Sequence, residues 1–332
     1  MNVKYIYSLL AVVALFLLAY VGVEGLGLKF LFGVIIPYVA VLTFLTGFTQ
    51  KVLGWARSFV PFRIPTTCGQ QKSMDWIKSS KLDCPTTTLG VVGRMALEIL
   101  LFRSLFRNTK MGFQGARIFY KWEIWLWIAA LAFHYSFLAV VFRHLRFFTD
   151  PVPFPVKLAE KLDSFFQIGL PVVYASGIVL LAAVIYLLIR RLIIPQVRYI
   201  SLAADYFPLF LIIGIAITGI MMRYFTKVDI ANIKSLTMGL VTFHPTTPDG
   251  ISGLFYAHLL FVSALLAYFP FSKLMHLGGV FLSPTRNMPT DTRARRHVNP
   301  WNYPVHVHTY EEYEDEFREK MIEAGLPVDK EE

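Results

Sequence analysis

Long apolar runs alternate with shorter polar segments along most of this chain. Six of these runs have about 20 residues, which is enough for an α-helix to cross the hydrocarbon core of a bilayer. They cover residues 5–22, 28–49, 124–142, 168–189, 206–222 and 251–271, and we expect the last helix to continue to residue 281. The pattern therefore predicts an all-α integral membrane protein with six transmembrane helices.

The first run has a second interpretation, because Lys4 precedes it as a basic residue precedes a secretory signal. Residues 22–27 contain no A-x-A cleavage pattern, however, so we expect the first helix to be retained.

The polar segments differ in charge, and this difference predicts an orientation. Residues 50–122 carry twelve Lys and Arg, and the segments from 190 to 200 and from 286 to 296 are also basic. The segments between them, 23–27, 147–165 and 226–250, are poorer in positive charge. Because basic segments stay in the cytoplasm, we expect a multi-pass cell-membrane protein with both termini cytoplasmic.

Composition supports the same class. Hydrophobic residues make up 55% of the chain and charged residues 16%, against about 25% charged in soluble domains. The net charge of +10 is therefore a topology signal, and no nucleic-acid-binding motif accompanies it. We expect the lipid bilayer as a partner and no nucleic acid.

Cys68 and Cys84 are the two cysteines. Two thiols are too few for an iron–sulfur cluster or a four-thiolate zinc site, so we expect reduced thiols. No CxxCH motif occurs, which excludes covalent c-type haem.

Four histidines lie in the third and sixth apolar stretches, where an ionisable side chain is costly and marks a functional site. His134 and His144 are ten residues apart, or about 15 Å of helix, and His258 and His276 are eighteen apart. The two helices run in opposite directions. Partners at similar depth are therefore His144 with His258 near the outer face and His134 with His276 near the cytoplasm. The two separations differ by about 12 Å for straight helices, so the pairing needs tilt or curvature.

Two such pairs suit the axial ligation of two b-type haems. One alternative is that the histidines bond to backbone carbonyls or hydroxyls of neighbouring helices. A zinc or copper site is less favoured, because no carboxylate or thiolate lies within either span. A further alternative is a membrane transporter or proton channel that uses the histidines as a relay, but this class predicts an inverted repeat and carboxylates within the spans.

The surroundings of these histidines resemble the gamma subunit of respiratory nitrate reductases, a diheme cytochrome b family. The similar stretches over residues 28–282 include Phe133-His134, Arg143-His144, Val241-Thr242-Phe243-His244 and Phe269 to His276. The extra N-terminal span, the long loop 50–122 and the tail look like the cytochrome b-like membrane subunit of sulfite-reduction-associated complexes, also called Hdr-like menaquinol oxidoreductases. The expected domains are 1–27, 28–282 and 283–332: a first helix, a five-helix diheme membrane domain and a tail.

This resemblance implies an oxidoreductase subunit of a respiratory complex with two haem b groups. Menaquinol would be oxidised near the outer haem, and electrons would leave through the inner haem to a cytoplasmic Hdr-like iron–sulfur subunit within a larger assembly. Lys161, within a turn of the family's quinol-site lysine, and His244 are candidate quinol residues. The candidate cations for the haem propionates are Arg143 and Arg146 outside and Arg190 and Arg191 inside.

Two segments outside the spans have helical patterns. Residues 90–107 mix apolar and charged positions and predict an amphipathic helix on the inner leaflet or against a partner. Thr309-x-x-Glu312 predicts a capping box that starts a helix with an aromatic face and an acidic face. We expect this tail helix to dock a cytoplasmic subunit; the alternative is a solvated, disordered tail.

Overall fold

A computed structural model describes residues 3–60, 70–74, 76–164, 172–291 and 306–329. Within these residues, six helical segments are long and apolar enough to cross a membrane. Their helices are α1 (Lys4–Glu24), α2 (Ile36–Ala56, preceded by a π-helical turn at Leu31–Ile35), α5 (Ile124–His144), α7 (Ala175–Ile193), α9 (Ala203–Ile220, followed by a π-helical turn at Met221–Phe225) and α11 (Gly253–Tyr268). The predicted fold class is confirmed.

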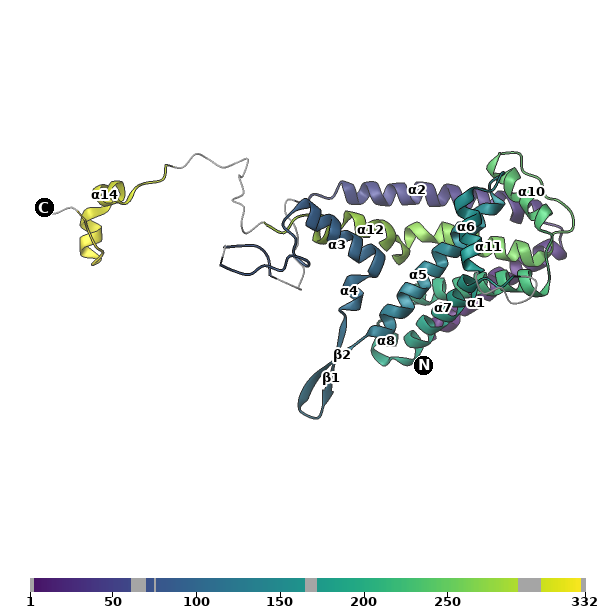
Figure 1. The fold of residues 1–332 in the computed structure, drawn as a ribbon, viewed down its shortest axis with the longest axis horizontal. Helices are drawn as coiled ribbons and strands as arrows, with labels where there is room; N and C mark the ends of the chain where they lie inside the picture. Colours follow the sequence, from purple (N-terminus) through teal and green to yellow (C-terminus); the bar gives the residue numbers. More distant parts are fainter. Residues whose placement is uncertain (1–2, 61–69, 75, 165–171, 292–305, 330–332) are drawn as a thin grey trace.

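The six helices form one bundle in which α5 packs on α7, α7 on α9, and α9 on α11 (Figure 1). The additional helix α1 packs on both α9 and α11, and α2 covers another side of α11. The largest buried cluster surrounds Tyr256 and Leu236, which are both fully buried. Leucines such as Leu10 and Leu18 of α1 are exposed, as expected for side chains that face lipid.

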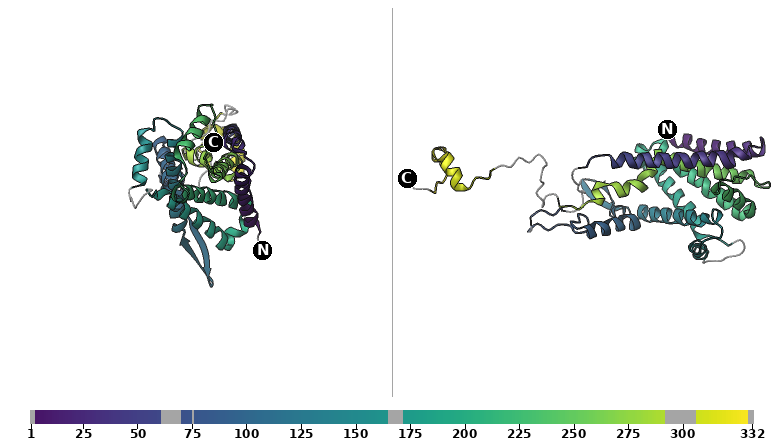
Figure 2. Two further views of the ribbon diagram at one scale, coloured as in Figure 1. Left: turned by 90° about the vertical axis from the view of Figure 1, so that its right-hand side faces the viewer. Right: turned by 90° about the horizontal axis from the view of Figure 1, so that it is seen from above.

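Contacts between distant segments define two ends of the bundle. At the first, Lys4 Nζ donates to Ser201 O at 3.2 Å and Arg94 donates to Thr285 O at 3.0 Å. We call this the basic end. It contains Lys4, residues 76–122 (blue in Figure 2), the 194–202 connection and residues 284–291. At the opposite end, Lys29 pairs with Asp249 at 2.9 Å. The described parts of the basic segments and of the less basic segments therefore lie at opposite ends of the bundle, as the charge pattern predicted.

The basic end contains elements that the apolar pattern did not predict. They are α4 (Arg103–Phe106), α8 (Pro195–Ile200) and an antiparallel hairpin of β1 (Thr109–Gln114) and β2 (Arg117–Trp122), in which Met111 lies opposite Tyr120. Gly115 has a φ of +63° at the turn, a conformation that glycine tolerates. The opposite end has two further helices, α6 (Phe154–Asp163) and α10 (Ile230–Val241).

The predicted helix over residues 90–107 is corrected. The structure has α3 (Thr88–Leu101), which ends because Phe102 adopts a left-handed conformation with a φ of +48°. The charged residues Arg94 and Glu98 are buried, whereas Leu89 is 82% exposed. The helix therefore buries its charged residues together with Val91 and exposes other apolar residues, unlike an amphipathic helix on a soluble protein.

The sixth span does not continue as one helix to residue 281. Two 3₁₀ turns, Phe269–Phe271 and Lys273–Met275, separate α11 from α12 (His276–Leu282), and a short helix α13 (Pro284–Asn287) follows. Pro270 has no N–H to continue the ladder, and Ser272 is extended at φ −121°, ψ 175°. The Ser272 hydroxyl then accepts from Leu274 N at 3.2 Å and starts the second turn.

The tail helix α14 (Tyr310–Glu323) begins at Thr309 with the predicted capping box, and Gly325 follows with a φ of +68° (Figure 1). Glu314, one of the residues of the expected acidic face, is fully buried. It accepts from Arg318 and from Asp329 N at 2.9 Å. The basic residues 293, 295 and 296, and Cys68, lie outside the described residues.

Candidate functional site

The imidazole rings face one another in two pairs. The centroids of His144 on α5 and His258 on α11 are 6.5 Å apart, with ring planes 18° from parallel. The centroids of His134 on α5 and His276 at the start of α12 are 5.9 Å apart, with planes at 87°. These are the two pairs that the depth argument predicted, and α5 otherwise packs chiefly on α7 rather than on α11.

The broken sixth span explains how both pairs form at once. Eighteen residues of straight helix would separate His258 and His276 by about 27 Å. The two 3₁₀ turns and the extended Ser272 interrupt the helix between them. His134 and His144, ten residues apart, also project from different faces of α5. The mismatch expected for straight helices is thus absorbed by the break and by the imidazole directions.

All four Nδ1 atoms are hydrogen-bonded inside the protein. His134 Nδ1 lies 2.7 Å from Ala130 O, and His144 Nδ1 lies 2.7 Å from Val140 O. His276 Nδ1 lies 2.9 Å from Lys273 O. A carbonyl oxygen can only accept, so each of these Nδ1 atoms carries the proton and each Nε2 keeps its lone pair.

His258 reaches the same tautomer through a side chain. Its Nδ1 lies 2.8 Å from Thr218 Oγ1 on α9. The threonine hydroxyl has one proton, which it donates to Gly214 O at 2.7 Å, so it accepts from His258. The His258 ring packs directly against α9 at Gly219, where a Cβ would lie 3.5 Å from His258 Cε1 in ordinary van der Waals contact. Thr218 could not be predicted from the sequence, because nothing local in a span indicates which hydroxyl faces a histidine on another helix.

The spacing fits a single metal ion within each pair. A metal–imidazole bond is about 2 Å, so two rings on opposite sides of one ion have centroids roughly 6 Å apart. Two imidazoles are too few ligands for zinc, and no cluster of three or more His, Cys, Asp or Glu occurs at either pair among the described residues. A porphyrin supplies four nitrogens itself and needs two axial ligands, which is the set that each pair offers.

Two aromatic rings contact His134 of the inner pair, whereas His276 is exposed. The Phe102 ring lies edge-on to His134 with centroids 4.9 Å apart, and Phe133 lies at 5.0 Å. Phe102 comes from the corner between α3 and α4, and no local sequence pattern indicates that it contacts His134. Asp83 anchors this corner through its ion pairs with Arg103 and Arg107. Burial alone would raise the pKa of Asp83, but the hydrogen bonds from the two arginines outweigh it and hold the pKa below its usual value.

The four arginines proposed for the propionates each have a carboxylate partner in the chain. Arg143 Nε lies 2.6 Å from Asp163, and its guanidinium lies 3.8 Å above the Tyr174 ring. The other pairs are Arg146 with Glu160, Arg190 with Glu123 at 2.8 Å, and Arg191 with Asp205 at 3.9 Å. These contacts tie helix ends together, and propionate binding by the arginines stays a prediction.

Lys161 and His244 are both exposed at the opposite end. His244 Nδ1 lies 2.8 Å from Thr242 O. Neither residue lines the cavity of about 200 Å³ at this end, whose walls are Arg146, Phe147, Val152, Lys157, Glu160, Ile230 and Lys234. Phe147 connects this cavity to the outer pair, because its ring centroid is 5.8 Å from that of His144.

Comparison with known proteins gives consistent matches. Residues 91–291 match the family described as nitrate reductase gamma subunit. The chain is 48% identical over 279 residues to the Hdr-like menaquinol oxidoreductase cytochrome b-like subunit of Archaeoglobus fulgidus, covering 82% of this chain and 83% of that protein. The protein of the same name from Archaeoglobus profundus is 41% identical over 80% of this chain and 81% of its own length. The respiratory nitrate reductase 1 gamma chain of Escherichia coli is 27% identical over 46% of this chain and 71% of its own length.

Proposed function

The chain belongs to the nitrate reductase gamma subunit family, and on that premise we propose that it is a diheme membrane subunit that carries electrons between menaquinol and a cytoplasmic iron–sulfur subunit. The resemblance predicted from the sequence is confirmed at the level of the family. Its relatives are named as oxidoreductase subunits, so the transporter or channel alternative is not favoured.

The observation that supports the proposal best is that all four histidines have the same tautomer. Each Nδ1 donates within the protein, and each Nε2 is left to bind iron from opposite sides of a pair. Such outer hydrogen bonds orient metal-bound imidazoles and raise their basicity. The alternative of histidines that simply bond to backbone carbonyls or to hydroxyls of neighbouring helices accounts for all four Nδ1 atoms. It does not account for rings that face each other in two pairs.

The two pairs lie at successive depths of one bundle. A haem bound at each would alternate between ferric and ferrous iron and so pass single electrons. His134 and His144 are separated by about 15 Å of α5, so haems bound at the two pairs would lie in series across the membrane. The aromatic side chains Phe102 and Phe133 supply apolar contacts to His134, and Phe147 supplies one to His144.

The cavity beside Phe147 is our candidate for the quinol head group. Lys157 and Arg146 offer donors to quinol oxygens, and Glu160 is the one carboxylate in its lining. Glu160 Oε1 also accepts a hydrogen bond from the Tyr174 hydroxyl at 3.4 Å, so an exchangeable proton lies beside this carboxylate. Protons from the quinol would leave at this end, which the charge pattern predicts to be the outer face.

The basic end is the proposed contact with the cytoplasmic subunit, and the inner pair is the one nearest to it. The tail from residue 284 onward belongs to this contact in our proposal. A chain truncated after residue 283 should keep its haems but lose the iron–sulfur subunit on purification. Retention of that subunit at the wild-type ratio would contradict this part of the proposal.

Haem content tests the central claim. Purified protein should show b-type α-band absorbance in a reduced-minus-oxidised spectrum and two haems per chain. His134→Ala and His258→Ala should each lose one haem or both, whereas His244→Ala, which changes an exposed histidine, should keep two. Protein without b-type absorbance, or variants of His134 and His258 with unchanged haem, would overturn the assignment.

A further inference from the structure

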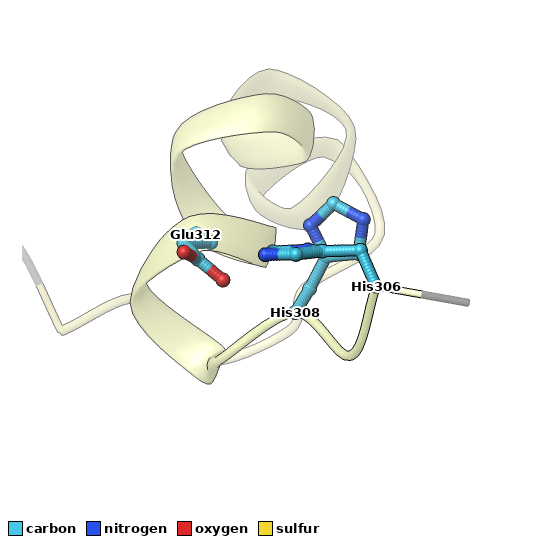
Figure 3. Close-up of side chains that lie close together, drawn as sticks. All are labelled: His306, His308 and Glu312. Carbon is cyan, nitrogen blue, oxygen red and sulfur yellow. The ribbon is translucent and has the colours of Figure 1, made fainter. Parts of the chain in front are cut away.

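A second group of possible metal ligands lies in the tail, at the start of α14 and apart from the paired histidines of the bundle. One ligand atom each from His306, His308 and Glu312 lie within 4.8 Å of one another. Figure 3 shows the two imidazoles and the carboxylate gathered at the first turn of the helix. The rings of His306 and His308 also contact each other, with centroids 4.9 Å apart.

The capping box brings the carboxylate to this position. Thr309 Oγ1 accepts from Glu312 N at 3.3 Å, and Glu312 Oε2 accepts from Thr309 N at 2.9 Å. Glu312 therefore turns back over the helix start, toward the residues that precede it. The reciprocal bond uses one carboxylate oxygen for the backbone, and a carboxylate has acceptor sites to spare for a cation.

We propose that His306, His308 and Glu312 form a binding site for a zinc-class divalent ion that clamps the chain before α14 to the first turn of the helix. Two imidazoles and a carboxylate are a ligand set of zinc sites. Magnesium and calcium prefer oxygen ligands alone, so this set selects against them.

Glu316 is the candidate for a fourth ligand. It lies one helical turn after Glu312, and its Oε2 is 4.0 Å from His308 Nδ1. An ion pair of protonated His308 with Glu316 would explain that contact alone. It would not explain why His306 also lies beside His308 and the capping carboxylate of Glu312, whereas a shared cation accounts for all four side chains. Because the three ligands are exposed, an ion can enter from solvent.

Zinc binding to the purified full-length chain tests the site directly, with no polyhistidine tag on the protein. After equilibrium dialysis against Zn²⁺, elemental analysis should give one zinc per chain more in wild type than in a His306→Ala/His308→Ala double variant. Glu312→Gln is the sharper variant, because glutamine at this position can still form the capping box. It should keep α14 helical and weaken zinc binding by roughly tenfold or more.

Matched controls distinguish zinc binding at this site from non-specific binding to exposed carboxylates and from metal bound by the paired histidines of the bundle. Glu319→Gln removes an exposed carboxylate on the same helix and should bind zinc like wild type, and Mg²⁺ should not compete. The haem content of all the variants should be unchanged. Equal zinc in wild type and the double variant, or equal loss in Glu319→Gln and Glu312→Gln, would overturn the proposal.

Discussion

Thr218 Oγ1 on α9 lies 2.8 Å from His258 Nδ1 on α11, so the orientation of one imidazole of the outer pair depends on a neighbouring helix. The other three imidazoles are held by carbonyls of residues three or four positions earlier in the chain. The outer pair is therefore the one whose ligand geometry a single side-chain substitution outside the ligand helices can change.

Thr218→Val keeps the shape of the side chain and removes the acceptor. Because the Nδ1 hydrogen bond makes the imidazole a stronger donor to iron, its loss should weaken outer haem retention by roughly 10–100-fold. The midpoint potential of the outer haem should rise for the same reason, as measured by a redox titration. Thr46→Val is the matched control, since Thr46 bonds only its own helix α2 through Leu42 O and Thr43 O. Equal potentials in wild type and Thr218→Val would contradict the role of this bond.

The two pairs should also differ in electron paramagnetic resonance. Near-parallel imidazole planes, 18° apart at His144 and His258, split the iron π-orbitals and give a rhombic low-spin ferric signal. Planes at 87°, as at His134 and His276, leave these orbitals nearly degenerate and give a strongly anisotropic signal. His276→Ala should remove the anisotropic signal and spare the rhombic one. Two identical signals in the wild-type protein would contradict the ring geometry.

Lys157 and Lys161 offer a test of the quinol site within one helix. Both lie on α6, but Lys157 lines the cavity beside Phe147 and Lys161 does not. Lys157→Gln should raise the KM for a soluble menaquinol analogue by roughly tenfold, which corresponds to about 1.4 kcal/mol of lost binding. Lys161→Gln should leave the KM unchanged. The reverse result would favour the resemblance-based assignment of Lys161 over the cavity.

The sequence predicts features that depend on residues close together along the chain better than contacts between distant elements. The spans follow from runs of apolar residues, and the histidine pairing follows from opposite helix directions and spacing along two helices. The partners of Arg143 and His258 do not follow, because Asp163 and Thr218 lie on other elements and no local pattern indicates them. The helix break at Ser272 does not follow from the sequence either. Pro270 is present there, but proline within a membrane span is often tolerated and does not by itself predict a break.

Asp83→Asn should loosen the corner that holds Phe102 against His134. The variant loses the charge that pairs with Arg103 and Arg107, at a local cost of about 1–3 kcal/mol, less where the arginines are solvated. Hydrogen exchange of residues 83–107 should be faster in the variant at pH 7. The folded pKa of Asp83 is depressed, so its stabilisation is present above the ordinary value of 3.8 and is lost as the pH falls through the depressed value. The difference between wild type and variant should therefore vanish in that acidic range, and equal exchange at pH 7 would contradict the anchor.

Alanine substitutions at Gly47 and Gly54 of α2 distinguish the effect of close packing at the helix break from the effect of helix propensity. A Cβ at Gly47 would lie 2.8 Å from Pro270 Cβ, so Gly47→Ala must push α2 away from the break that leads to His276. A Cβ at Gly54 meets nothing within 4 Å, so Gly54→Ala should stabilise α2 by up to about 1 kcal/mol through propensity alone. We expect Gly47→Ala to cost about 1–3 kcal/mol in thermal unfolding and to disturb the His134–His276 haem more than the outer one. The low-spin ferric signals of the two haems, recorded in both variants, measure this selectivity. If Gly47→Ala behaved like Gly54→Ala, the contact between α2 and Pro270 would have no part in placing His276.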